Sequence, residues 1–89
     1  TWVLNMKELF VLAWHSYAEI EDELDGAVVG VYETLQQAQE VMTENVEETA
    51  SYYDSEDIEV IIEDTEATMR TTNNYFIKYY IESKFILLS

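Results

Sequence analysis

From Glu19 to Glu66 the chain carries seventeen acidic side chains and no lysine or arginine, which gives this 48-residue block a formal charge of −17. The flanking segments together add two positive charges, so the net charge of the chain is −15. Like charges at this density repel one another and oppose a compact state. The chain can therefore fold only if its other residues supply a dense apolar core.

The remaining residues can supply such a core. Of the 89 residues, 48% are hydrophobic and 13% are aromatic, whereas disordered acidic segments lack the apolar side chains that offset chain entropy. A chain of this length forms one domain and buries roughly 60% of its unfolded surface. We expect a single domain over residues 1–89, with residues 1–5 as an upstream or non-native extension, because Met6-Lys7-Glu8 resembles a natural start.

The composition excludes several kinds of site. The chain has no cysteine, so it forms no disulfide and no cysteine-ligated zinc site, which fits a reducing cytoplasm. No stretch approaches the roughly 20 apolar residues that span a bilayer. A net charge of −15 also disfavours direct contact with nucleic acid or anionic lipid. We expect a cytoplasmic protein without direct membrane or nucleic-acid binding.

Two strands are expected in the first part of the chain. Residues 9–17 are apolar at both alternating sets of positions, as in a central strand. Residues 27–33 form a second apolar run, and the acidic turn at residues 18–26 joins the two into a hairpin.

The acidic turn resembles the start of a calcium-binding EF-hand loop. Glu21, Glu23 and Asp25 followed by Gly26 match the first ligand positions and the glycine of that loop. The twelfth position is Tyr32 rather than glutamate, and strands flank the turn instead of helices. We interpret it as a solvated hairpin tip and expect no metal site.

An amphipathic helix is expected to begin after Thr34. The Thr34 hydroxyl and the Gln37 side chain, three residues apart, form the pattern of a capping box. The side chains expected on its buried face recur at helical spacing: Leu35, Ala38, Val41, Met42, Val46, Thr49 and Tyr53.

The last part of the chain is expected to form two strands. Residues 58–62 alternate in polarity and are expected to extend towards Met69, and residues 71–74 form an asparagine-containing turn. Residues 75–88 form a long final strand. The predicted fold is α+β with the order ββαββ: a four-stranded antiparallel or mixed sheet with one amphipathic helix packed on one face.

One helix covers only one face of a sheet, so the other face is a candidate interface. The apolar side chains assigned to this uncovered face are Phe10, Leu12, Trp14, Phe76, Tyr80, Ile86 and Leu88. The final strand is also longer than its expected partners, so its apolar end should overhang the sheet and pair with another chain. We predict a homodimer that uses Phe10, Trp14, Tyr80, Phe85 and Leu87.

No catalytic constellation is present in the sequence. His15 is the only histidine, no cysteine accompanies it, and Ser16 would point to the opposite face of the strand. No glycine-rich phosphate loop occurs, and four basic residues do not build a phosphate clamp. We expect neither an enzyme nor a cofactor.

The acidic face of the helix is the strongest candidate for a partner site. Like-charge pairs four residues apart, such as Glu40 with Glu44, destabilise a helix, and acids near its C-terminus oppose the helix dipole. No basic residue in the block relieves this repulsion. The candidate partner-binding residues are Glu40, Glu44, Glu47, Glu48, Asp54, Glu56, Asp57, Glu59 and Glu63.

Gly-Val-Tyr-Glu-Thr at residues 30–34, followed by a helix rich in glutamine and glutamate, resembles a pattern in short bacterial and phage proteins. The small size, the absence of proline and cysteine, and the acidic surface are similar to phage-encoded anti-defence proteins, including anti-CRISPR DNA mimics. This resemblance implies a protein that inhibits a nucleic-acid-binding partner.

We therefore expect a non-enzymatic protein-binding domain. It would present the carboxylates of the helix, of residues 19–25 and of residues 54–66 to a basic nucleic-acid-binding surface. The alternative is a small assembly protein that self-associates through its apolar sheet face. Adaptation of the surface to high salt is a third explanation of the charge.

Overall fold

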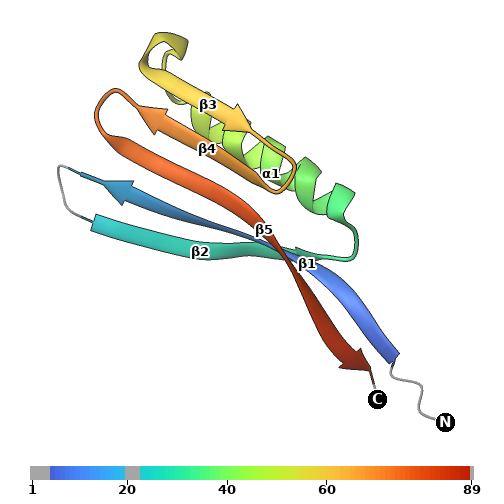
Figure 1. The fold of residues 1–89 in the computed structure, drawn as a ribbon. Helices are drawn as coiled ribbons and strands as arrows, with labels where there is room; N and C mark the ends of the chain where they lie inside the picture. Colours follow the sequence, from blue (N-terminus) through green and yellow to red (C-terminus); the bar gives the residue numbers. More distant parts are fainter. Residues whose placement is uncertain (1–4, 20–22, 89) are drawn as a thin grey trace.

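The computed structural model describes residues 5–19 and 23–88, which form one antiparallel sheet and one long helix (Figure 1). Along the chain the elements are β1 (Asn5–Ala18), β2 (Glu23–Tyr32), α1 (Leu35–Ala50), the short 3-10 helix η1 (Ser55–Asp57), β3 (Ile58–Ile62), β4 (Glu66–Thr71) and β5 (Tyr75–Leu88). The strand order is β2-β1-β5-β4-β3. Since α1 connects the two edge strands, it lies across one face of the sheet, behind the strands in Figure 1.

The α+β class and the single helix on an antiparallel sheet agree with the sequence prediction, but the prediction of four strands is wrong. The segment from Ile58 to Met69 is not one strand: it turns at residues 63–65, and β3 pairs back onto β4 with Ile62 opposite Ala67. The Glu63 N–H donates to the Glu66 carbonyl at 2.8 Å and closes this turn. The hairpin gives the backbone of both strands antiparallel partners and leaves β3 at the edge of the sheet.

Helix α1 begins where the sequence predicts. The Thr34 hydroxyl accepts from the Gln37 N–H at 3.1 Å, and the Thr34 N–H donates to Gln37 Oε1 at 3.2 Å, which completes the capping box. The helix ends at Ala50, one turn before Tyr53, and Ser51 is its C-cap, with the Ser51 hydroxyl donating to the Glu48 carbonyl at 2.6 Å. Its buried side chains are Ala38, Met42 and Val46.

The core lies between α1 and the sheet, and this placement corrects part of the predicted interface. Leu12 is fully buried and lies opposite Ile81. Phe10 and Trp14, on the same face of β1, also pack against this core. These three residues therefore belong to the helix-covered face and not to the uncovered one. Residues 9–17 are apolar on both faces, so only the register with β5 decides which set lies under the helix.

The prediction that β5 extends beyond its partner strands is also wrong, because β1 pairs with β5 as far as its end. β1 has 14 residues, as β5 does, and the two strands pair along their whole lengths. Pairing with β2 begins at Phe10, and pairing with β4 reaches only to Tyr80. Residues 5–9 of β1 and 84–88 of β5 thus leave the sheet as a two-stranded ribbon, hereafter the ribbon (Figure 1).

The ribbon makes the molecule elongated. Its principal extents are 59 × 25 × 15 Å, and the Cα radius of gyration is 16.0 Å. A compact domain of this length has a radius of gyration of about 12 Å.

Candidate protein-binding surfaces

The outer side of α1 carries an exposed stripe of carboxylates. Glu40, Glu44 and Glu48 recur every four residues. Each lies two positions after a buried residue of the helix (Ala38, Met42 or Val46). Two positions correspond to a rotation of about 200° around the helix axis, so each glutamate lies on the side opposite the core. Glu47 is exposed beside them. From Glu40 to Glu48 the stripe extends about 12 Å along the helix axis. The four carboxylates therefore point away from the core, as the sequence predicts.

No basic side chain neutralises this stripe in the described part of the chain. The ion pairs there join Lys7 Nζ to Glu33 at 2.8 Å, Lys78 to Glu66 at 3.0 Å and Lys84 to Glu82 at 3.2 Å. Within the stripe, Glu40 Oε1 accepts from Gln36 Nε2 at 3.3 Å. A cationic partner could thus bind these carboxylates without displacing an internal ion pair.

Three further acids follow directly after the helix. Asp54, Glu56 and Asp57 are exposed on and before η1, in the segment that leads from the C-terminus of α1 into β3. Together with the helix stripe they form what we call the acidic surface: Glu40, Glu44, Glu47, Glu48, Asp54, Glu56 and Asp57.

The other two candidate acids lie outside the segment formed by the helix and η1. Glu59 lies opposite Arg70 and lines a shallow hollow with Arg70 and Phe76 on the uncovered face of the sheet. Glu63 lies in the β3–β4 turn, at the opposite end of β3 from η1. Both are exposed. The turn that holds Glu63 lies beside the N-terminal half of α1, because Gln39 Nε2 donates to the Asp64 carbonyl at 2.9 Å, whereas Glu59 lies on the uncovered face.

The uncovered sheet face has a different chemical character. The register places Lys7, Lys78, Lys84 and Arg70, the four basic residues of the chain, on this face. Tyr80 lies there as predicted, with its ring centroid 5.6 Å from that of His15.

Two glutamates on this face have altered pKa values. The hydrogen bond and the charge of Lys78 lower the pKa of Glu66, and Lys7 lowers the pKa of Glu33 in the same way. Each pairing holds its carboxylate in the ionised form, so these acids are already engaged within the molecule.

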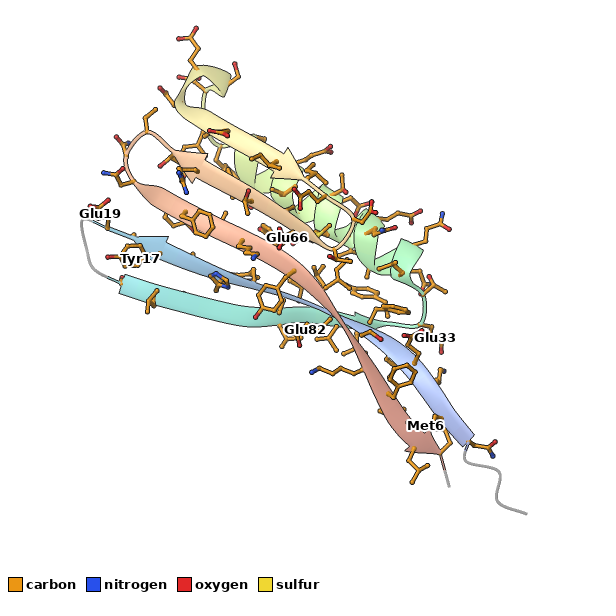
Figure 2. The ribbon with its side chains drawn as sticks, viewed as in Figure 1. Met6, Tyr17, Glu19, Glu33, Glu66 and Glu82 are labelled. Carbon is orange, nitrogen blue, oxygen red and sulfur yellow. The ribbon has the colours of Figure 1, made fainter. Side chains whose placement is uncertain are left out.

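The ribbon exposes a concentration of apolar side chains. The exposed fractions are 54% for Met6, 61% for Phe85, 41% for Ile86, 67% for Leu87 and 45% for Leu88. Figure 2 places Met6 near the tip of the ribbon and Glu33 near its base. Of the predicted self-association residues, Phe85 and Leu87 lie on the ribbon and Tyr80 lies on the sheet face.

Sequence reasoning missed the contribution of β1 to the ribbon. Residues 5–8, which include Lys7 and Glu8, show no apolar alternation that would predict a strand. The apolar end of β5 could have predicted it, because an apolar strand end needs a neighbouring strand to pair with.

Only part of the turn that resembles a calcium-binding loop lies within the described residues. Glu21 and Asp22 lie outside the described residues, and the Asp25 carboxylate accepts from the Gly26 N–H at 2.8 Å. Among the residues that the structure describes, no cluster of three or more histidine, aspartate or glutamate side chains is arranged to hold a metal ion.

Comparisons with protein families, with curated proteins and with solved structures found no match for this chain. Within residues 5–19 and 23–88, no helix has both the length and the apolar character needed to cross a membrane.

Proposed function

We propose that this protein is a non-enzymatic, cytoplasmic binding domain of phage or mobile-element type, which inhibits a nucleic-acid-binding protein by occupying its basic surface. The observation that carries the proposal is the helix stripe, in which four exposed carboxylates have no basic neighbour among the described residues.

The energetics of α1 support a role in binding. Glu47 and Glu48 lie in the last turn, which contains no basic residue, and the first turn contains no acid. This is the reverse of the arrangement that the helix dipole favours, at roughly 0.3–1 kcal/mol for each charge. Like-charge pairs at four-residue spacing add a few tenths of a kcal/mol each. A surface that lowers the stability of its own helix is more readily explained by a partner than by folding.

The chemistry of the acidic surface suits a partner that binds phosphates. Proteins hold the nucleic-acid backbone largely through Arg and Lys side chains, and the same side chains bind carboxylates through charge-assisted hydrogen bonds. Attraction between surfaces of opposite charge also accelerates association and weakens steeply as salt is added. The inhibitor would thus compete with nucleic acid for the same cations.

The proposal is tested by neutralising the stripe. The variant Glu44→Gln/Glu47→Gln/Glu48→Gln should lose capture of its partner from nuclease-treated lysate at low salt, while circular dichroism shows a folded helix. The charge-reversal variant Glu44→Lys/Glu47→Lys/Glu48→Lys should abolish capture.

Of residues 19–25, which the sequence prediction included among the presented carboxylates, the described Glu19, Glu23 and Asp25 lie at the β1–β2 hairpin, on the opposite edge of the sheet from β3, and are not part of the acidic surface as defined above. The matched control is therefore Glu19→Gln/Glu23→Gln/Asp25→Asn, which removes the same charge from exposed positions at that hairpin. It should retain capture. Equal loss in both neutral variants would show that net charge alone, and not the helix stripe, is responsible. Unchanged capture by the charge-reversal variant would contradict the proposal.

A second candidate function is assembly through a homodimer. The ribbon favours it, because five apolar side chains of the ribbon are between 41% and 67% exposed. Exposed apolar surface of this kind is typical of interaction sites. The two functions are compatible, since the ribbon and the acidic surface are formed by different residues.

A further inference from the structure

The edge of β5 that faces away from β1 is unpaired over seven residues. β4 pairs with β5 up to Tyr80, and the Ile81 N–H donates to the Thr65 carbonyl at 2.8 Å. Beyond that bond no backbone contact to this edge is formed by the described residues, so Glu82–Leu88 presents about 24 Å of free strand edge.

An isolated two-stranded ribbon is marginally stable in water. Here the ribbon also exposes apolar side chains on both of its faces, with Ile86 and Leu88 on one and Phe85 and Leu87 on the other. An edge that is long, apolar and unpaired readily adds a strand from another chain. The ribbon therefore has an unpaired strand edge and exposed apolar side chains that an additional strand could cover.

The exposed area of the whole chain is large for its mass. The chain exposes 6436 Å². A compact monomer of 10.4 kDa exposes about 5,400 Å². The difference of about 1,000 Å² reflects the elongated shape, to which the ribbon and its exposed apolar side chains contribute.

We propose that a second copy of this chain covers the ribbon, with β5 of each copy paired antiparallel along the edge Glu82–Leu88. This inference names the surface and the register for the assembly function above and does not depend on the acidic surface.

Symmetry restricts the register. Two identical antiparallel strands are related by a two-fold axis perpendicular to their sheet, so residues of the same face must lie opposite one another. The register that uses all seven residues places the axis at Phe85, which then lies opposite Phe85 of the second copy. Ser83 lies opposite Leu87, Lys84 opposite Ile86, and Glu82 opposite Leu88.

The charges on this edge fit the register. No like charges lie directly opposite each other, which would destabilise the pairing. Lys84 lies diagonal to Lys84 of the second copy, and Glu82, 3.2 Å from Lys84 in the same chain, neutralises each of them. An axis at Lys84 would instead put the two lysines face to face and pair only five residues.

The oligomeric state tests the proposal. Sedimentation equilibrium of the full chain at 10–100 µM should give twice the mass of 10.4 kDa. Because both copies are strongly anionic, self-association should tighten between 50 and 500 mM NaCl, whereas partner binding by the acidic surface should weaken. The two functions can thus fail separately.

Two variants address the named edge. Phe85→Lys should weaken dimerisation at least tenfold and leave the thermal midpoint of the diluted protein unchanged, since Phe85 is outside the core cluster. The matched control is Leu24→Lys on β2, where an apolar side chain is 77% exposed, and it should remain dimeric.

A cysteine scan tests the register, because the chain has no cysteine of its own. Directly opposed Cα atoms lie about 4.5–5.5 Å apart, within the range of a disulfide. Phe85→Cys should form a covalent dimer under mild oxidation, and Leu24→Cys should not.

A wild-type protein that is monomeric at 100 µM would contradict both the proposed β5 pairing and the assembly function. A dimer that persists in Phe85→Lys, or that does not cross-link in Phe85→Cys, would contradict pairing along this edge but not self-association itself.

Discussion

Asn5 of β1 lies directly opposite Leu88 of β5, at the end of an unbroken register that begins with Ala18 opposite Tyr75. The two longest strands therefore stay paired to their ends, beyond the point where β2 and β4 stop. This relationship produces the ribbon and places both described ends of the chain at its tip (Figure 1).

The ribbon should be the least protected part of the sheet when the protein is dilute. Hydrogen exchange at 1 µM should show faster exchange of the amides of residues 84–88 than of residues 76–80, which lie between β1 and β4. At 100 µM the amides of residues 84–88 should become protected if copies pair there. Equal protection at both concentrations would contradict the account of this edge.

Trp14 should contribute to stability rather than to an interface. It packs against the core beneath α1, so Trp14→Ala should lower the free energy of unfolding by about 3 kcal/mol, measured by urea denaturation. Ile61→Ala is the matched control, because Ile61 is 48% exposed on the edge strand β3 and should cost less than about 1 kcal/mol. A Trp14→Ala protein of wild-type stability would contradict the placement of β1.

Neutralising the C-terminal acids of α1 should stabilise the protein. Glu47→Gln/Glu48→Gln removes two charges that oppose the helix dipole and the repulsion between Glu44 and Glu48, for a gain of about 1 kcal/mol. For a domain of this size the thermal midpoint should rise by about 4–8 °C. The gain should shrink in 0.5 M NaCl, because salt screens exposed charges. A lower midpoint at low salt would contradict this reading of the helix.

The dependence of folding on salt distinguishes a partner-binding acidic surface from an acidic surface that is an adaptation to high salt. We expect the wild-type chain to be folded in dilute buffer, with added salt raising the thermal midpoint. A chain that unfolds at low salt and folds only in molar KCl would favour the saline explanation of the charge.

The ion pair of Lys78 with Glu66 should give a defined pH dependence. Lys78 lowers the pKa of Glu66 in the folded protein, so the pair contributes stability above the unfolded pKa, and this contribution is lost as the pH falls through the folded pKa. The stability difference between wild type and Lys78→Gln should therefore shrink as the pH falls from 6 to 3. Titration of the Glu66 carboxyl by NMR should show its pKa below the usual range in wild type and near it in the variant.

Much of the fold follows from local sequence signals. The capping box at Thr34 and Gln37 determines where α1 begins. Asn74 adopts a left-handed conformation, with φ of 63°, in the turn before β5. The exposure of the helix glutamates follows from their spacing, and the shortage of ion pairs follows from a chain with only four basic residues.

The errors arise where a local signal is weak or ambiguous. The β3–β4 turn at Glu63-Asp64-Thr65 has no glycine, proline or asparagine, so Asp64 within a short polar run is its only turn signal and is a weak one. β1 is apolar on both faces, and only its tertiary register with β5 decides that Trp14 lies under the helix. The ribbon depends on how far two distant strands remain paired, which no local pattern specifies.

The most direct test of the proposed function is competition with DNA. The protein captured from lysate is purified and bound to a labelled duplex in 50 mM NaCl, and fluorescence anisotropy follows the duplex as this acidic protein is added. The account predicts that the wild type and the Glu19→Gln/Glu23→Gln/Asp25→Asn control displace the duplex, and that Glu44→Gln/Glu47→Gln/Glu48→Gln requires at least a tenfold higher concentration. A ternary complex in which the duplex stays bound, or equal displacement by all three proteins, would contradict it.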